Sequence, residues 1–492
     1  MKNYHAVDLV AIAWHAMSRY GFEPRFPDAV IREVSAINGD KIPDSRHAIR
    51  DLRQLLWSSI DNYDSMDLDQ IEYCERGGNG EIIVTVAIAD VDLFVPDNSQ
   101  TDQHAAFNGT SVYTGIVTFP MLPDRLSKGI SSLLPGGDHR AIVIRYAVLP
   151  DGSVRPGSIC QALVANKAKL VYEEIGRWLE GDTAAPVSVK EVAGLEDQLR
   201  LQMEAALRMK KYREGKGALD LETIEAQAVI EQGAVRDIVL QKKNLARQLI
   251  EEFMVAANGT MVAFLGKAGI PMIQRVVRIP KNWAGIVGLA ETHGAVLPPQ
   301  PDAAALARFL EKQRSADLEH FPDLSLAVVK LIGPGEYVPL DPGAVPVGHF
   351  GLAVTDYTHS TAPNRRYVDL ITQRLVKSVL DSKPSPYTHN ELADQSAWLT
   401  DREKGSKKVE RFMRKAAAAV LLHDQTGKTF DALVTGASPK GTYVRLIIPP
   451  AEGRVMQGEE GLTVGQRVRV RLLQTDPYNG FIDFAYIGKR PV

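Results

Sequence analysis

Four aspartates, Asp61, Asp64, Asp67 and Asp69, fall within nine residues just ahead of an apolar stretch that is typical of a β-strand. Carboxylates at this density make one another's ionisation harder, so the segment is either a solvated acidic loop or the binding site of a cation. Asp67 and Asp69 are two residues apart and would share one face of an extended strand, and Asp61 can fold back toward them from the end of the preceding apolar stretch. Spacing alone leaves the solvated loop as the commoner outcome.

The chemistry that such carboxylates could support is phosphodiester hydrolysis. Converging carboxylates suit Mg²⁺, which keeps several waters and takes further ligands from phosphate. Two such ions about 4 Å apart can activate a water and stabilise the leaving oxygen of a phosphodiester.

A pair of arginines, Arg365 and Arg366, follows Pro363 at the start of a segment with helical periodicity. Two cations at a helix N-terminus face the positive end of the helix dipole, which disfavours a purely solvated pair. An arginine fork can bind a phosphate through two N–H groups and stabilise charge that develops on phosphorus. The pair therefore predicts a buried or anionic partner.

Positive charge also gathers in residues 401–415, where seven basic and three acidic residues give a local charge of +4. The chain of 492 residues carries a formal net charge of −3, so any surface for a polyanion must be local. A solvated helix face is the ordinary explanation of such a run. Beside a phosphodiester site, the same run becomes a candidate wall of a single-strand channel.

The elements that must position these residues form a large α+β body. Residues 1 to about 45 predict two short helices, and strand signals dominate from about 46 to 165, as in "EIIVTVAIADVDLFV" after the turn signal "ERGGNG". Residues 166 to 265 predict mostly helix, including a long helix through "NLARQLIEEFMVAANGTMVAFLGKAG". Residues 281 to 335 predict further helices, and an Ala- and Lys-rich helix follows from 401.

From about residue 427 to 487 the pattern changes to short strands with turns every eight to twelve residues, which predicts a small β-barrel. Tyr443 follows a glycine turn on one of these strands. Arg467, Arg469 and Arg471 alternate along another, so they share one face and could follow a line of phosphates. Nine basic and six acidic residues between 427 and 492 make the module mildly positive.

The segment "IDNYDSMDLDQ" places Asp61, Asp67 and Asp69 in the register I-D-x5-D-x-D, and residues 46 to 425 resemble the catalytic (RNB) domain of the ribonuclease II family. Further landmarks of that family follow in order: "IADV", "NGTSVY", "FPMLP", "SLLPG", "GALDLE", "LIEEFMVAAN" and "YTHSTAPNRRYVDL". The C-terminal strands are similar to the RNA-binding OB-fold first named from a large ribosomal protein.

The resemblance implies an α+β fold with three parts. Residues 46–425 would form the RNB catalytic domain, a mixed β-sheet core wrapped by helices. Residues 426–492 would form the OB-fold, a small β-barrel of the ribosomal-protein type that binds RNA. Residues 1–45 would form a short helical region in place of the two cold-shock domains that relatives usually carry.

The resemblance also implies a hydrolytic 3′→5′ exoribonuclease that degrades single-stranded RNA to nucleoside 5′-monophosphates, with Mg²⁺ or Mn²⁺ as cofactor. It implies catalytic roles for Asp67, Asp69 and Arg365, and a metal site of Asp61, Asp67, Asp69 and Gln70. It implies RNA contacts from both modules, at Tyr113, Arg366, Glu410, Tyr443, Arg467 and Arg469. Tyr113 would stack on a base near the 3′ end, and Asp369 and Arg374 would brace the helix after the arginine pair.

One departure from the family bears on activity: Gln70 stands where the family has a fourth aspartate. Its amide oxygen can coordinate Mg²⁺, but it carries no charge and cannot act as a base. Either the site works with three aspartates and this amide, with Asp64 as a further carboxylate in the loop, or the chain is a weak or inactive relative that binds RNA in a regulatory role. We expect an active enzyme, because the other landmarks are in place.

The composition, with 45% hydrophobic and 24% charged residues, is that of a soluble globular protein, and no run of eighteen apolar residues predicts a membrane span. The two cysteines, Cys74 and Cys160, exclude a disulfide framework and a Cys-rich zinc module, and they fit a reducing cytoplasm. We therefore expect a cytoplasmic protein whose partner is single-stranded RNA, without membrane association. Nothing in the sequence indicates a stable protein partner.

Overall fold

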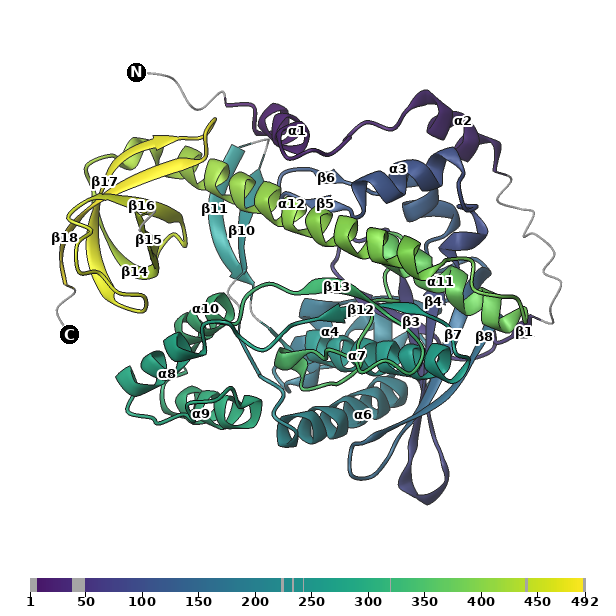
Figure 1. Cartoon of the computed structure of the whole chain (residues 1–492). Helices are drawn as coiled ribbons and strands as arrows, with labels where there is room; N and C mark the ends of the chain where they lie inside the picture. Colours follow the sequence, from purple (N-terminus) through teal and green to yellow (C-terminus); the bar gives the residue numbers. More distant parts are fainter. Residues whose placement is uncertain are drawn as a thin grey trace.

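The large body of the protein is built on one seven-stranded sheet. The computed structural model describes residues 7–37, 49–222, 225–231, 234–241, 243–318, 320–438 and 441–489. The strand order is β1-β8-β7-β4-β3-β2-β9 (Figure 1), and neighbours run antiparallel except β1 with β8 and β2 with β9. The strands are β1 (Arg50–Asp51), β2 (Ser58–Asp61), β3 (Gln70–Arg76), β4 (Ile82–Ala89), β7 (His139–Val148), β8 (Val154–Val164) and β9 (Ala168–Val171).

The centre of this sheet is buried on both faces. Seven of the eight residues of β4, "IIVTVAIA", are buried, which matches a strand of β-branched and small apolar residues without alternation. Helices α6 (Leu195–Gly215) and α7 (Leu245–Lys267) pack against the sheet, and the Tyr146 hydroxyl on β7 donates to the backbone oxygen of Phe253 on α7 at 3.2 Å. By length and composition alone α7 could cross a membrane, but 67% of its most apolar window is buried in the body, as in a core helix.

Two further helices, α11 and α12, follow the arginine pair in the chain. α11 (Tyr367–Leu380) begins directly after the arginine pair, and α12 (His389–Leu422) runs from the body to the barrel (Figure 1). A capping box starts α12, since the Thr388 hydroxyl accepts from the Glu391 backbone and the Glu391 carboxylate accepts from the Thr388 backbone. Around them lie α1 (Leu9–Arg19), α2 (Asp28–Ala36), α3 (Gln100–Asn108), α4 (Tyr172–Leu179), α5 (Val187–Lys190), and the strand pairs β5 (Val112–Tyr113) with β6 (Thr118–Phe119) and β12 (Met272–Val276) with β13 (Glu336–Leu340).

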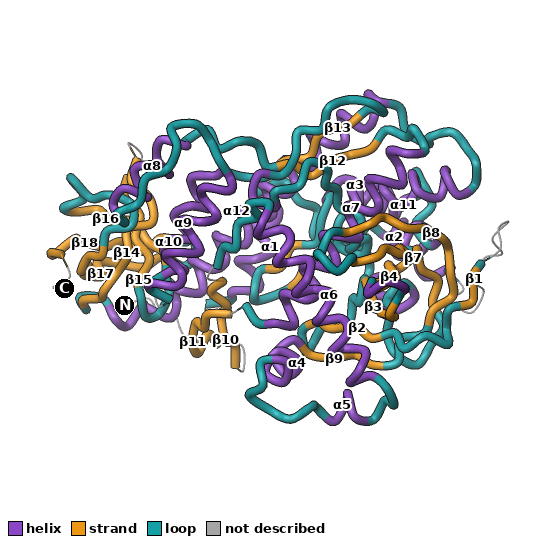
Figure 2. The backbone as a smooth tube through the Cα atoms, turned by 90° about the horizontal axis from the view of Figure 1, so that it is seen from below, coloured by secondary structure: helices purple, strands orange, loops and turns teal. Residues whose placement is uncertain are grey.

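The C-terminal module is a closed five-stranded barrel in the order β14-β15-β16-β18-β17, which confirms the predicted barrel. Its strands are β14 (Thr429–Ser438), β15 (Gly441–Leu446), β16 (Glu452–Gln457), β17 (Arg467–Asp476) and β18 (Phe481–Lys489). A separate helical cluster, α8 (Trp283–Thr292), α9 (Ala303–Ala316) and α10 (Phe321–Ile332), has its own small core and lies beside the barrel, where α10 contacts β14 (Figure 2).

Two elements differ from the sequence prediction. The segment 166–265 is not mostly helical throughout, because β10 (Glu225–Glu231) and β11 (Ala234–Gln241) form an antiparallel hairpin in its middle. α12 is longer than predicted, since it begins at His389 rather than near 401. The hairpin reflects tertiary context, which outweighs the local helical signals around it. The earlier start of α12 reflects the capping box of Thr388 and Glu391, a local signal that the sequence prediction did not use.

Candidate active site

The acidic loop connects two adjacent strands of the sheet, β2 and β3, and this places Asp61 and Asp69 at the same end of the strand pair. Asp61 is the last residue of β2 and Asp69 immediately precedes β3, and β2 and β3 pair antiparallel with Ser58 opposite Glu72. The Asp61 carboxylate accepts hydrogen bonds from the Asn62 backbone at 2.7 Å and the Ser65 hydroxyl at 2.9 Å. Burial raises the pKa of Asp61, and the nearby charge of Asp67 raises it further.

Asp69 is the most enclosed carboxylate of the loop, with 3% of its side chain exposed. One oxygen accepts the backbone N–H of Asn364 at 2.9 Å, and the other lies 3.8 Å from Nε of Arg365. Burial raises the pKa of Asp69 to about 8, although the Arg365 guanidinium and the Asn364 N–H act in the opposite direction. The surroundings of Asp69 therefore disfavour its ionised form, because they supply too little positive charge.

The two neighbouring arginines have different surroundings. Arg365 lies next to Asp69 with 45% of its side chain exposed, so its guanidinium can still meet an anion. The Nε and one terminal nitrogen of Arg366 each donate to an oxygen of Asp369 at 2.8 Å, and Asp369 is fully buried. Asp369 also accepts the Ala362 backbone N–H at 2.8 Å, so this pair fixes the turn that presents Arg365.

Tyr113 faces the same space as Arg365. The Ser111 backbone donates to the Arg365 carbonyl at 3.0 Å and the Tyr367 backbone donates to the Gly109 carbonyl at 3.0 Å, so the two segments run side by side. The Tyr113 ring is 42% exposed, and its hydroxyl donates to Asp67 at 3.2 Å. A cavity of about 200 Å³ lies beside these groups, lined among others by Tyr113, Tyr337, His359, Arg365, Glu403 and Glu410.

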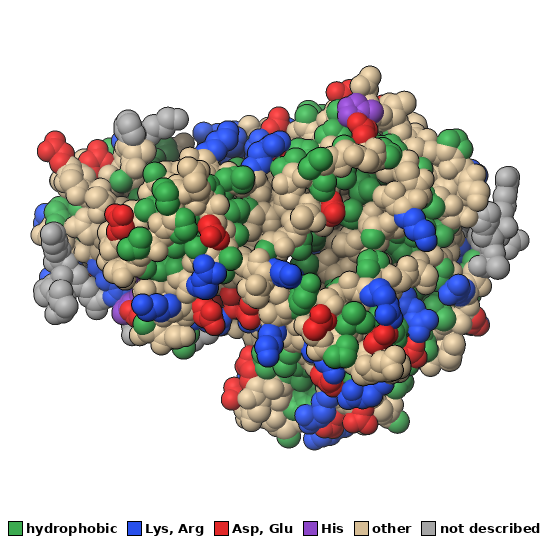
Figure 3. Space-filling view, turned by 60° about the horizontal axis from the view of Figure 1, so that its bottom comes forward, with side chains coloured by type: hydrophobic (Ala, Val, Ile, Leu, Met, Phe, Trp, Pro, Cys, Tyr) green, Lys and Arg blue, Asp and Glu red, His purple; other side chains and the backbone are tan. Residues whose placement is uncertain are grey.

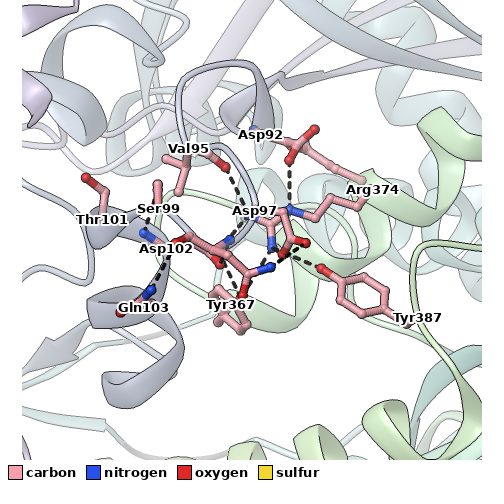
Figure 4. Close-up of polar contacts among 12 residues, drawn as sticks. Asp92, Val95, Asp97, Ser99, Thr101, Asp102, Gln103, Tyr367, Arg374 and Tyr387 are labelled. Atoms are coloured by element: carbon pink, nitrogen blue, oxygen red, sulfur yellow. Dashed lines mark hydrogen bonds and ion pairs between the residues drawn. The ribbon is translucent and has the colours of Figure 1, made fainter.

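An ion-pair cluster around Arg374 anchors α11, and with it the arginine turn (Figure 4). The guanidinium, 5% exposed, donates to Asp92 at 2.8 Å, Asp97 at 3.1 Å and Asp102 at 2.6 Å. Tyr387 supplies its hydroxyl to the same group at 2.9 Å. The sequence prediction that Asp369 and Arg374 brace the helix after the arginine pair is confirmed by these contacts.

The donor atoms of the loop suit a divalent cation, although they do not form a complete coordination shell. In the part of the chain that the structure describes, no three His, Cys, Asp or Glu side chains lie close enough together to hold a metal ion. The carboxylates of Asp61, Asp67 and Asp69 are nevertheless hard oxygen donors, and the charge of Asp67 raises the pKa of both Asp61 and Asp69. Mg²⁺ is usually bound by only one or two carboxylates together with substrate phosphate and water, so a buried carboxylate that lacks countercharge suits it.

Comparison with known proteins agrees with the fold. Residues 49–382 match the RNB domain, which covers more than half of the chain, and residues 428–487 match the RNase II-type exonuclease C-terminal S1 domain. The chain belongs to the RNB ribonuclease family. Ribonuclease R of Thermotoga maritima is 30% identical over 94% of this chain, which spans 68% of the length of that relative and 59% of Ribonuclease R 1 from Lactococcus lactis.

Solved structures of RNB proteins share the fold. The structure of Mycoplasma genitalium RNase R in complex with ribose-methylated single-stranded RNA superposes with a TM-score of 0.85 at 21% identity, covering 98% of this chain and 78% of that one. Yeast Ssd1, described as a pseudonuclease, superposes with a TM-score of 0.68 at 15% identity, covering 96% of this chain and 59% of that one. At these identities the likeness concerns the fold. The family assignment confirms the predicted RNB domain and the RNB-type exoribonuclease class.

Gln70, which departs from the RNB pattern, and Asp64, which could offset that departure, lie in different surroundings. Gln70 is the first residue of β3 and is partly buried. Asp64 is exposed at the surface of the loop. The fourth-aspartate position is thus close to the site, whereas Asp64 is turned toward solvent.

The predicted RNA-binding residues of this RNB protein lie in three places. Tyr113 and Arg366 line the cavity beside Asp69, and Glu410 lines its α12 side. Tyr443 lies on β15 opposite α12, where Nζ of Lys415 is 5.4 Å from the centre of its ring.

The arginines of β17 do alternate outward between buried valines, as predicted, but two of them have acidic neighbours. Arg467 lies 3.6 Å from Asp323 of α10, which is also bound by Arg445 of β15. Nε of Arg469 lies 3.9 Å from Asp431. Arg467 therefore helps to dock the barrel on the helical cluster, and phosphate contacts by Arg467 and Arg469 stay a prediction.

Two residues near the site were not singled out from the sequence. Asn364 joins the arginine turn to the body, since its backbone binds Asp69 and its side-chain oxygen accepts from Ser131 at 2.6 Å. The sequence feature that could have identified Asn364 is its position between Pro363 and Arg365.

Glu72 lies on β3, fully buried, and among the described residues neither carboxylate oxygen has a hydrogen-bond partner. The sequence around Glu72, between Ile71 and Tyr73 on a predicted strand, does not show whether other elements cover the face of the sheet on which its side chain lies.

We expect Glu72→Met to stabilise the protein. Burying a carboxyl group without a partner costs about 1–3 kcal/mol, and Met fills a similar volume without that cost. Thermal unfolding followed by circular dichroism should show a higher midpoint. The matched control is Glu252→Met, because Glu252 is equally buried but is bound by Arg213, with one contact of 2.8 Å. That variant should be destabilised by about 3–5 kcal/mol, and a loss of stability in both variants would contradict the prediction for Glu72.

Proposed function

We propose that this chain is a hydrolytic 3′→5′ exoribonuclease that degrades single-stranded RNA to nucleoside 5′-monophosphates and requires Mg²⁺ or Mn²⁺. The observation that carries the proposal is that Arg365, whose Nε lies 3.8 Å from the buried Asp69, lines a cavity of about 200 Å³ together with Tyr113, whose hydroxyl donates to Asp67. The carboxylates would hold the cation, the guanidinium would meet a phosphate and the ring would stack on a base. Such stacking is tolerant of sequence, which suits an enzyme that must grip any RNA.

The chemistry assigned to each residue follows from its surroundings. Asp61, Asp67, Asp69 and the amide oxygen of Gln70 would hold the cation, which when bound activates water and neutralises phosphate charge. Water adds to phosphorus, the P–O3′ bond breaks and the departing 3′-oxygen takes a proton, so the released nucleotide keeps a 5′-phosphate. Burial raises the pKa of Asp69 to about 8 in the absence of a cation, so binding of the cation would release a proton from Asp69 near neutral pH. The Arg365 guanidinium would stabilise the charge that develops on the phosphate oxygens.

The proposal is tested with single-stranded RNA labelled at its 5′ end. With Mg²⁺ we expect a ladder of products that shorten from the 3′ end, and EDTA should abolish it. A circular RNA of the same sequence should remain intact, because it has no 3′ end. Cleavage of the circle would indicate an endonuclease, and RNA binding without any cleavage would refute the proposed activity.

We expect Arg365→Ala to lower the rate of RNA cleavage by about 10²–10³-fold with little change in RNA affinity, since the lost interaction stabilises the transition state more than the bound substrate. Single-turnover cleavage of labelled RNA measures the rate, and fluorescence anisotropy in EDTA measures affinity. Arg365→Lys should recover only a small part of the rate, because an ammonium cannot form two parallel bonds to a phosphate. An equal loss of affinity and rate would contradict the assigned role.

A second candidate function is an RNA-binding or regulatory protein with weak or no nuclease activity. It is favoured by Gln70, which removes one carboxylate from the predicted metal site. The discriminating variant is Gln70→Asp. If the chain is a decayed enzyme, the wild type should show almost no RNA cleavage and Gln70→Asp should raise it. If the chain is an active enzyme, the wild type itself should cleave RNA.

We further propose a cytoplasmic location, which the two free cysteines, Cys74 and Cys160, support.

A further inference from the structure

Two adjacent serines, Ser131 and Ser132, lie behind the candidate active site and contact both of its halves, the acidic loop and the arginine turn. Both side chains are buried. The serines follow directly on a π-helical turn, Leu126–Ile130, and such turns are frequent at functional sites. We call the two residues the serine bracket.

Ser132 holds the backbone on both sides of Asp67. Its hydroxyl donates to the Met66 carbonyl at 2.6 Å and accepts the Leu68 backbone N–H at 2.9 Å. The next residue, Leu133, donates its own N–H to the Leu68 carbonyl at 2.9 Å. A single buried hydroxyl therefore fixes the two peptide groups that flank Asp67, and the direction of the Asp67 carboxylate depends on them.

Ser131 holds the residue that precedes Arg365. Its hydroxyl donates to the side-chain oxygen of Asn364 at 2.6 Å, and the Leu126 carbonyl lies 2.8 Å from the same hydroxyl. Asn364 is buried, and its backbone N–H donates to Asp69 at 2.9 Å. Because Asn364 is fixed at its side chain by Ser131 and at its backbone by Asp69, the start of Arg365 is fixed as well.

The serine bracket acts on a separation that the proposed reaction depends on. Nε of Arg365 lies 3.8 Å from Asp69, which is too long for a hydrogen bond. That separation is therefore set by the backbone that carries the two residues, and the serine bracket holds this backbone on both sides. Misplacing a reacting group by about 1 Å can lower a rate about a hundredfold.

The serine bracket cannot contact RNA directly, because both of its side chains are buried. On the face seen in Figure 3 basic and acidic side chains are interspersed, and replacing a buried neutral side chain changes none of these charges. Substitutions in the bracket should therefore leave the electrostatic attraction of RNA as it is.

We propose that Ser131 and Ser132 are positioning residues of the active site, each for one half of it. Ser132 orients Asp67 toward the cation, and Ser131 holds the turn that presents Arg365 to the phosphate. Loss of Ser132 then weakens cation binding, whereas loss of Ser131 slows cleavage through the arginine. The role of Ser131 rests on the proposed function, but that of Ser132 can be measured without RNA.

Binding of Mn²⁺ in the absence of RNA, followed by electron paramagnetic resonance, tests Ser132. Ser132→Ala should weaken Mn²⁺ binding about tenfold, as is usual when an outer partner of a metal ligand is lost, and Ser131→Ala should leave it within about twofold. Ser132→Cys keeps a weaker donor in a similar volume, so its Mn²⁺ affinity should lie between those of the wild type and Ser132→Ala. Equal Mn²⁺ affinity in the wild type and Ser132→Ala, or no Mn²⁺ binding by the wild type, would overturn the role of Ser132.

Single-turnover cleavage of labelled RNA tests Ser131. Ser131→Ala should lower the rate about tenfold in the wild-type background but less than about twofold when Arg365 is already replaced by Ala, because effects that pass through one residue do not add. RNA affinity, measured by anisotropy in EDTA, should stay unchanged. Equal losses of rate in the two backgrounds would overturn the role of Ser131.

The matched control is Ser325→Ala in the separate helical cluster. Ser325 is fully buried, and its hydroxyl accepts the Glu222 backbone N–H at 3.2 Å. Its loss should lower the midpoint of thermal unfolding about as much as the bracket variants do, without changing Mn²⁺ affinity or cleavage rate. If Ser325→Ala shows the same losses as the bracket variants, reduced stability explains them and the proposal fails. A wild type with Ser132-dependent Mn²⁺ binding but no cleavage would refute the proposed function and the role of Ser131, and would leave that of Ser132 standing.

Discussion

Replacing Asp69 with Asn lowers the rate of RNA cleavage by about a thousandfold while the protein folds and still binds RNA. The substitution removes the charge from the most enclosed carboxylate of the acidic loop and keeps its shape. Loss of a group that positions or activates the attacking water typically lowers a rate by about 10²–10⁴-fold. The same change would weaken a cation site that depends on negatively charged oxygens, and this effect acts in the same direction.

The fold should tolerate Asp69→Asn for a specific reason. The amide oxygen of Asn can still accept the Asn364 backbone N–H that Asp69 accepts at 2.9 Å. Burial already raises the pKa of Asp69 to about 8, so a neutral side chain is not disfavoured at this place. Single-turnover cleavage measures the rate, and anisotropy in EDTA measures RNA affinity. Asp64→Asn is the matched control in the same loop, and a comparable loss there would contradict a special role for Asp69.

Replacing Arg374 with Met should destabilise the body by about 3–5 kcal/mol, the usual cost of removing one partner from a buried ion pair. The cluster holds Asp92, Asp97 and Asp102 around a single guanidinium, and Asp102 is as buried as Arg374 itself. Without the arginine these carboxylates repel one another away from water. Because α11 carries Arg365 just before its first turn, cleavage should also fall as the helix loosens.

Thermal or urea unfolding measures the effect on stability, and cleavage at low temperature separates it from loss of folded protein. Arg155→Met is the matched control, because Arg155 pairs with Glu81 at 2.7 Å but is 58% exposed. An exposed pair of this kind contributes less than about 1 kcal/mol. Equal effects in the two variants would show that the Arg374 cluster does not brace α11.

The local parts of the site could be predicted from the sequence because they depend on short spacings. The acidic loop and the start of a helix after Pro363 need only neighbouring residues for their interpretation. The closed barrel was predictable for the same reason, since its turns recur at regular intervals. The different surroundings of Arg365 and Arg366 were not, because they depend on which guanidinium meets the buried Asp369 once the turn has folded.

Features that depend on long-range packing were missed. The complete burial of Glu72 follows from the layers that cover β3, which a strand pattern alone does not specify. The hairpin of β10 and β11 interrupts a region of strong helical signals, and tertiary context decides between the two. The serine bracket joins the acidic loop to the arginine turn, and these three segments are far apart in the sequence, so no local pattern could indicate it.

The most direct test of the account uses RNA with a single radioactive phosphate in its last internucleotide linkage. The account predicts that Mg²⁺ releases this label at once, without a lag, as a nucleoside 5′-monophosphate, and that Asp69→Asn and EDTA both prevent the release. Label that stays in long products while the 5′ end shortens, or that leaves as a 3′-phosphate, would contradict it.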